Sequence, residues 1–108
     1  MSDRYRVLFT VRRQYFDQIV AGTKDREVRR LSKRWATVDG RVRAALRAGE
    51  PAPVAVFLCG RRVHRRLIYG SEIHVNAVAA LGRAPSEQGR ADLGDGPVIA
   101  FLLGAVAL

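Results

Sequence analysis

Three charged side chains, Lys24, Glu27 and Arg29, fall within six positions directly after Gly22, in the spacing G-x-K-x-x-E-x-R. If the chain is extended from about Asp25, Glu27 and Arg29 project from the same face of a strand. They would then lie roughly 7 Å apart, because side chains alternate and the rise is ~3.3 Å per residue. This arrangement puts a carboxylate beside a guanidinium, with an ammonium at the entrance.

Such a set of groups has three possible uses. It could bind a base or a phosphate without chemistry. It could catalyse hydrolysis, with Lys24 and Glu27 moving protons if burial adjusts their proton affinities to the working pH and with Arg29 holding a carbonyl or phosphate. It could also be structural, with Glu27 and Arg29 paired to fix the strand against a helix while Lys24 is solvated. Spacing alone does not separate these uses.

The charge of the whole chain favours an anionic partner. Its 108 residues are the length of one domain, expected to span residues 1–108, and they have a formal net charge of +9. Lys and Arg side chains release counterions when they meet phosphates, so nucleic acid is the first candidate. The alternative explanation for the excess of basic residues is a high genomic GC content, which favours arginine codons. All basic residues except Lys24 and Lys33 are arginines. One of the two lysines nevertheless falls in the motif.

Several classes of protein are disfavoured. No apolar run approaches the ~18 to 20 residues of a membrane helix, and no signal-type segment follows Met1, so we expect a cytoplasmic protein. Cys59 is the only cysteine and falls in an apolar run, which predicts a buried, inert thiol. His64 and His74 are ten residues apart and have no metal-ligand spacing. We expect neither a metal nor a cofactor.

The motif must be positioned by the elements around it. Alternating apolar residues predict a strand over residues 4–12, and apolar spacings of three and four predict a helix over residues 14–21 that Gly22 ends. A second strand follows over residues 25–31. Ser32 is expected to cap a turn that includes Trp35, and Asp39 to cap a second helix that ends before Gly49.

The rest of the chain is mostly extended. Residues 54–59 predict a central strand, and residues 61–66 a basic hairpin rim. Residues 67–78 predict two extended halves around Gly70, and residues 97–108 a closing strand, whereas the glycine-rich residues 82–96 predict a mobile loop. The fold class is therefore α+β, a small and partly open β-barrel of five or six strands with two short helices inserted early in the chain.

Residues 15–29, YFDQIVAGTKDREVR, resemble the helix and the G-x-K-x-x-E-x-R signature of the ASCH domains, a branch of the PUA-like superfamily. Trp35 is similar to a position in small phage and bacterial members. The later strands and the basic segment match more loosely. The resemblance implies a PUA-like barrel whose cleft, between the first helix and the sheet, is lined by the motif and suits a nucleotide or an RNA strand.

The family resemblance also implies two kinds of activity. Some relatives bind RNA, whereas others are hydrolases, including an amidohydrolase acting on acylated cytidine and a claimed ribonuclease. The amidohydrolase pattern is G-x-K-x-x-T-x-R, so this chain departs from it at Glu27. A downstream catalytic glutamate of those enzymes matches Glu72 or Glu87 only by position along the chain.

These observations predict an RNA or modified-nucleoside binding module whose ligand site is Lys24, Glu27, Arg29 and Trp35, with RNA or a nucleotide-like molecule as partner. A small hydrolase using Lys24 and Glu27 is the alternative, and an assembly domain that meets an acidic protein is a third. Trp35 and Tyr69 could stack bases, or pack inside the fold. Two basic groups could form a phosphate track or a solvated surface: Arg12, Arg13, Lys33 and Arg34, and Arg61, Arg62, Arg65 and Arg66.

Overall fold

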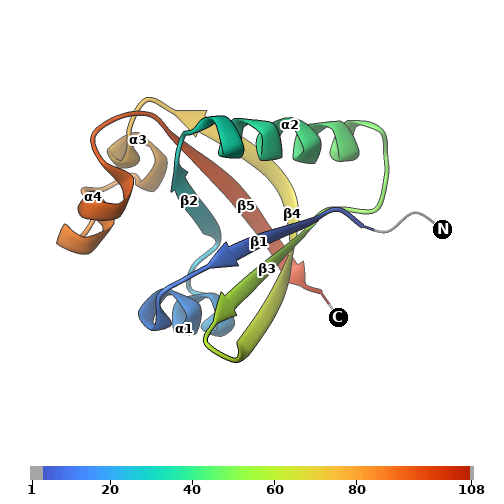
Figure 1. Ribbon diagram of the computed structural model, residues 1–108, viewed down its shortest axis with the longest axis horizontal. Helices are drawn as coiled ribbons and strands as arrows, with labels where there is room; N and C mark the ends of the chain where they lie inside the picture. The colour runs from blue at the N-terminus through green and yellow to red at the C-terminus, as the bar shows by residue number, and fades with distance from the viewer. Residues whose placement is uncertain (1–3, 108) are drawn as a thin grey trace.

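A single sheet of five strands curls into a half-barrel in the computed structural model, which describes residues 4–107 (Figure 1). The strand order is β1-β3-β4-β5-β2, in which β1 runs parallel to β3 and all other neighbours are antiparallel. The elements in chain order are β1 (Arg6–Thr10), α1 (Arg13–Ala21), β2 (Arg26–Arg30), α2 (Lys33–Arg47), β3 (Val54–Cys59), β4 (Arg62–His74), α3 (Ala77–Leu81), α4 (Glu87–Leu93) and β5 (Val98–Val106). This architecture confirms the predicted α+β class and the small, partly open barrel of five or six strands.

The main core fills the inside of the curl. Phe9, Phe57 and Phe101 are fully buried there, on three different strands, and Phe9 stacks on Phe57 with ring centroids 5.3 Å apart. Helix α1 adds Phe16 and Ile19 from one side of the half-barrel. The alternation predicted for the first strand is confirmed, because every second residue of β1 is buried.

The turn after α1 delivers the motif to β2. Gly22 adopts the left-handed conformation at φ 78°, which a side chain at Cβ disfavours. Its N–H donates to the carbonyl of Ile19 at 3.2 Å, and the N–H of Thr23 donates to that of Gln18 at 3.0 Å. These bonds satisfy the last carbonyls of the helix, and Lys24 follows directly on the way into β2.

The second helix is longer than predicted. Ser32 is its N-cap and accepts a hydrogen bond from the N–H of Trp35 at 3.2 Å, so the predicted cap is confirmed. The prediction that Asp39 caps a helix is wrong, because α2 runs without interruption through Asp39, which is buried. Its carboxylate accepts from Arg43, one turn later on the same helix, and from the hydroxyl of Ser71 on β4, and these partners offset the poor helix propensity of aspartate.

Two further helices occur late in the chain, where residues 67–96 were predicted to be extended or looped. Asn76 caps α3 and Ser86 caps α4, each through its side-chain oxygen. Both helices lie together at one side of the sheet (Figure 1). They cover its outer face with a second, smaller apolar cluster: Val28, Ala77, Ala80, Leu93, Val98 and Ala100. The helices of the described residues are thus not confined to the early part of the chain.

The structure also corrects details at the basic segment, Tyr69 and Cys59. The basic segment belongs to a hairpin, as predicted, but most of it is strand and not rim, because β4 begins at Arg62 and pairs with β3 from there. Of the two alternatives for Tyr69, packing inside the fold is wrong, because 61% of its surface is exposed. Cys59, at the end of β3, is only partly buried. Among the described helices, none combines the length and apolar character needed to cross a membrane.

Candidate ligand-binding cleft

Strand β2 is at one edge of the sheet, and both of its faces are occupied by charged residues. Glu27 is opposite Phe101 and Arg29 is opposite Ile99 on β5, so both project toward the inside of the half-barrel. The intervening residues, Arg26, Val28 and Arg30, project toward α3 and α4 on the outside. A strand of five residues therefore contributes to two different walls.

On the inner face, Glu27 is held between two cations. Its Oε2 lies 2.9 Å from Nζ of Lys24, and its Oε1 lies 3.2 Å from Nε of Arg29. Only 4% of the surface of Glu27 is exposed, whereas both partners are partly exposed. The ammonium of Lys24 also lies 5.0 Å from the ring centroid of Tyr15 on α1. The predicted adjacency of carboxylate and guanidinium is confirmed, and the lysine belongs to the same cluster.

Arg29 links the two edge strands of the half-barrel. Besides Glu27 on its own strand, it donates from Nη2 to the carbonyl of Thr10 at the end of β1, at 3.1 Å. Its guanidinium lies 5.2 Å from the ring of Phe9 and 5.6 Å from that of Trp35. Two nitrogens of Arg29 are therefore engaged within the fold, whereas Nζ of Lys24 donates to Glu27 alone among the described residues.

On the outer face, two arginines of β2 hold the ends of the late helices. Arg26 donates to the carbonyl of Ala80 near the end of α3 at 3.3 Å and pairs with Glu72 at 3.1 Å. Arg30 donates to the carbonyl of Leu93 at the end of α4, also at 3.3 Å. Carbonyls in the last turn of a helix have no partner inside it, so these contacts fasten α3 and α4 to the sheet.

A cleft of about 1330 Å³ lies between α1 and the pair α3 and α4, with β2 at its base. Its lining includes six basic and three acidic side chains, so the cleft has an excess of positive charge. The basic residues are Arg12, Lys24, Arg26, Arg29, Arg30 and Arg83, and the acidic residues are Asp25, Glu27 and Asp92.

An ion pair crosses this cleft near its mouth. Arg12, just before α1, donates from Nη2 to Oδ1 of Asp92 on α4 at 3.1 Å and from Nε to Oδ2 at 3.3 Å. Gln88 donates to the same carboxylate at 3.0 Å. The hydrogen bond from Arg12 holds the pKa of Asp92 below its ordinary value, and the same bond raises the pKa of Arg12.

The structure brings only part of the predicted ligand site together. Lys24, Glu27 and Arg29 line the cleft, as does Arg12 from the first basic group. Trp35 lies outside the lining, where its ring stacks on Phe9 with centroids 5.2 Å apart. The remaining predicted basic residues also lie outside it: Arg13, Lys33, Arg34, Arg61, Arg62, Arg65 and Arg66.

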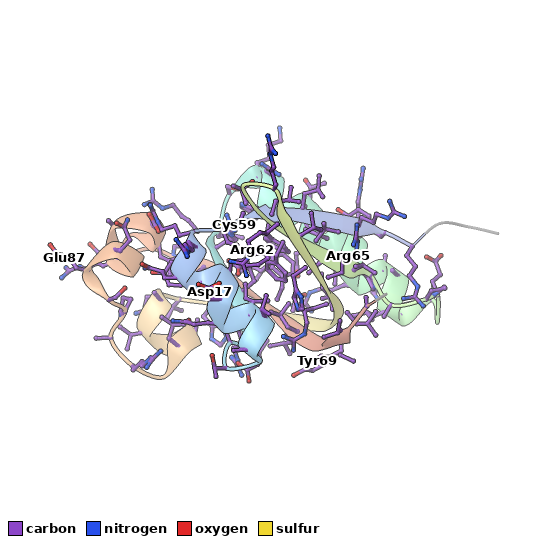
Figure 2. All side chains as sticks on the ribbon, turned by 90° about the horizontal axis from the view of Figure 1, so that it is seen from below. Asp17, Cys59, Arg62, Arg65, Tyr69 and Glu87 are labelled. Carbon is purple, nitrogen blue, oxygen red and sulfur yellow. The ribbon has the colours of Figure 1, made fainter. Side chains whose placement is uncertain are left out.

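The second basic group makes contacts of its own. Arg62 pairs with Asp17 of α1 at 2.9 Å, and its guanidinium lies 4.4 Å from the ring centroid of Phe16. Figure 2 shows Asp17 and Arg62 beside each other, with Arg65 farther along the strand. Arg66 donates to the carbonyl of Ile19, so this arginine fastens β4 to α1.

Sequence reasoning missed Arg26, Arg30, Arg83 and Asp92. Arg26 and Arg30 occur in the motif segment, and their alternation with Glu27 and Arg29 predicts that they face the other side of the strand. No sequence pattern around Asp92 indicates that it contributes to a cleft. Of the two candidate glutamates, Glu72 pairs with Arg26 but is not itself part of the cleft lining, and Glu87 lies at the outer end of the molecule (Figure 2).

Residues 4–107 contain no group of three or more His, Cys, Asp or Glu side chains that could hold a metal ion. The two histidines are separate, and the Nε2 atom of each is buried without a hydrogen bond among the described residues, although that of His74 lies 3.5 Å from Oε1 of Glu72. Burial lowers the pKa of His64, and the charge of Arg66 lowers it further. Besides the charged residues and the ring of Tyr15, the cleft is lined by hydroxyl and amide side chains: Thr10, Gln14, Gln18, Thr23 and Ser86.

The fold and cleft define a small PUA-like half-barrel with a basic groove. A solved structure with this fold is that of a mutant ZmASCH protein from Zymomonas mobilis, which is 20% identical and superposes with a TM-score of 0.59. The match covers 95% of this chain and 70% of that chain. It confirms the fold that the resemblance implied. No protein-family profile and no curated protein matches the chain.

Proposed function

We propose that this protein binds RNA or a modified nucleoside in the cleft between α1 and the late helices. The observation that supports this most directly is the convergence of Lys24, Glu27 and Arg29 in a groove lined by more cations than anions. Phosphate groups are attracted to such a groove, and counterions released from the nucleic acid add to the affinity. An RNA ligand also agrees with the predicted cytoplasmic location.

The size of the cleft favours a strand over a single small molecule. Its volume of about 1330 Å³ exceeds the ~300–1,000 Å³ that is typical of small-molecule pockets. A nucleoside could lie at the motif while neighbouring phosphates extend toward the mouth. Arg12 and Arg83 are exposed there and line the path.

Within the motif, we assign different roles to the three side chains. Both oxygens of Glu27 are engaged, so its carboxylate orients the cations and does not itself meet the ligand. Arg29 contacts the Thr10 carbonyl and two aromatic rings. Lys24 uses one N–H for Glu27, and its ammonium can point further donors at a phosphate or base oxygen.

Binding of a fluorescently labelled single-stranded RNA, followed by polarisation, tests the proposal. Lys24→Ala should weaken binding about tenfold, in line with ~1.4 kcal/mol for a charge-assisted contact. Lys33→Ala is the matched control, because it removes the only other lysine, which is exposed and outside the cleft. Its effect should be no more than about twofold.

The salt dependence gives a second measurement on the same complex. Affinity should fall steeply as salt rises, with a log–log slope that becomes shallower by ~0.7 if Lys24 contacts a phosphate of a single strand. Equal weakening by the two lysine variants, or binding that ignores salt, would contradict a site in the cleft.

A hydrolase is the second candidate, because Nζ of Lys24 lies within 2.9 Å of a carboxylate oxygen of Glu27. A proton could pass between these groups at that distance during attack on an acylated cytidine or on RNA. Incubating the protein with N4-acetylcytidine and with RNA, followed by chromatography of the products, tests for turnover. Activity that survives Lys24→Ala would exclude this assignment of the catalytic pair.

A further inference from the structure

The ion pair at the mouth of the cleft joins residues that are far apart in sequence. Arg12 and Asp92 are separated by 80 positions, one just before α1 and the other on α4. Both lie on the lining of the cleft, so their contact spans the space that a ligand would enter. The two side chains keep 54% and 40% of their surface exposed.

The geometry of this pair resembles that of a guanidinium with a phosphate. Two nitrogens of Arg12 face the two oxygens of Asp92, as a guanidinium fork faces two oxygens of a phosphate. A pair as exposed as this one is weak, because water competes for both partners. A phosphate with other cations nearby can therefore replace the carboxylate.

The wall of the cleft does not depend on this pair. Arg30 holds α4 through the carbonyl of Leu93, and Leu93 itself is buried in the outer apolar cluster. Gly94, which follows, is at φ 68°, and a Cβ there would lie 3.1 Å from the guanidinium of Arg30. Asp92 can release Arg12 while α4 stays in place.

We propose that Arg12 forms a phosphate subsite at the mouth of the cleft and that the Asp92 carboxylate occupies it when no ligand is bound. This inference rests on the proposed binding function and adds a specificity-determining residue to it. Asp92 excludes weakly bound anions from Arg12, and a nucleic-acid phosphate that also reaches Lys24 or Arg83 displaces it. The carboxylate thus competes with the ligand, and removing its charge strengthens binding.

The test compares Asp92→Asn with Asp95→Asn for binding of a single-stranded RNA hexamer at one salt concentration. The two changes alter the net charge equally, but Asp95 lies beyond α4, pairs with Arg90 and does not line the cleft. Asp92→Asn should tighten binding about two- to fivefold, which is the range expected for loss of an exposed ion pair. Asp95→Asn should change it by much less. Urea denaturation of each variant checks that it is folded.

The same pair of substitutions is then made in an Arg12→Ala background. If Asp92 acts by occupying the subsite, Asp92→Asn should tighten binding there no more than Asp95→Asn does, because the double-mutant cycle isolates the part that depends on Arg12. A gain that equals that of Asp95→Asn, or that persists without Arg12, would overturn the subsite while leaving RNA binding intact. Absence of RNA binding in the wild type and in every variant would instead overturn the proposed function, and the subsite with it.

Discussion

The ammonium nitrogen of Lys24 lies 2.9 Å from Oε2 of Glu27, a carboxylate with only 4% of its surface exposed. A carboxylate buried to this extent is costly unless cations and hydrogen bonds compensate it. Arg29 provides the second cation on the other oxygen. The anion therefore holds two positive charges at the base of the cleft, where they would otherwise repel each other.

Replacing this carboxylate should destabilise the fold. Glu27→Gln keeps the shape but leaves Lys24 and Arg29 without their anion, and we expect a loss of about 1–3 kcal/mol in the free energy of unfolding. Urea denaturation followed by the fluorescence of Trp35, the only tryptophan, measures it. Glu50→Gln is the control, because Glu50 is exposed and has no ion pair among the described residues. Equal stability of the two variants would mean that the cations do not need Glu27.

Arg29 should not tolerate replacement by lysine. Arg29→Lys keeps the charge but loses the fork that reaches both Glu27 and Thr10, and also the guanidinium contact with the ring of Phe9. We expect a loss of about 1–2 kcal/mol in stability from the hydrogen bonds and the cation–π contacts. Thermal unfolding measures the change.

Arg34→Lys is the matched control for Arg29→Lys. The guanidinium of Arg34 also lies over the ring of Trp35, at 4.9 Å, but the residue is exposed. Its replacement should cost less than about 0.5 kcal/mol, as surface changes usually do. A larger loss from Arg34→Lys than from Arg29→Lys would show that the link between the two edge strands is unimportant.

Asp39 should be the most sensitive residue of α2. Its buried carboxylate accepts from Arg43 at 3.1 Å and from Ser71 on β4, so it ties the helix to the sheet. Asp39→Ala should cost about 2–4 kcal/mol, because it leaves the hydroxyl and the guanidinium without their acceptor. Chemical denaturation gives the value. Asp95→Ala, at a highly exposed aspartate, should stay within about 0.5 kcal/mol of wild type.

Stability should decrease as the pH falls below the ordinary His64 pKa of 6.5. Burial lowers the pKa of this histidine in the folded state, with Arg66 adding to the effect. The unfolded chain then binds a proton before the folded one, so unfolding is favoured as pH drops from about 7 to 5. The lowered pKa of Asp92 acts only at lower pH, near and below its ordinary value of 3.8.

Urea denaturation across this pH range tests the role of His64. The measured quantity is the change of the free energy of unfolding with pH. In the variant His64→Phe, the phenylalanine ring can pack against Phe16, and the part of this pH dependence that comes from the histidine should disappear. A slope that is identical in wild type and variant would contradict the assignment.

Local patterns predicted the elements that present the motif. Alternation in β1, the apolar spacing of α1 and the glycine at position 22 are short-range signals, and each element was confirmed within two residues. The adjacency of Glu27 and Arg29 was predictable for the same reason, because two residues on one face of a strand are neighbours in any fold that keeps the strand.

The late helices were not predictable in this way. Glycines and mixed charges in residues 82–96 are typical of a loop, yet α4 forms because Leu93 is buried against the outer face of the sheet and Arg30 holds its last carbonyls. Asp39 was assigned to a cap because aspartate favours that position. In the structure, the Asp39 carboxylate lies inside the helix and accepts a hydrogen bond from the hydroxyl of Ser71 on β4.

By itself, the sequence determined the class of fold and the order of charges along β2, because these depend on periodicities of two and of about 3.6 residues within short segments. Only the tertiary structure decided which charges share a cleft. Lys24 meets Glu27 through a local turn, but Asp92 reaches Arg12 across 80 residues because α4 folds back over β2. The position of α4 over β2 depends on burial and on helix-end hydrogen bonds between segments that are distant in sequence. It therefore cannot be predicted from any one segment alone.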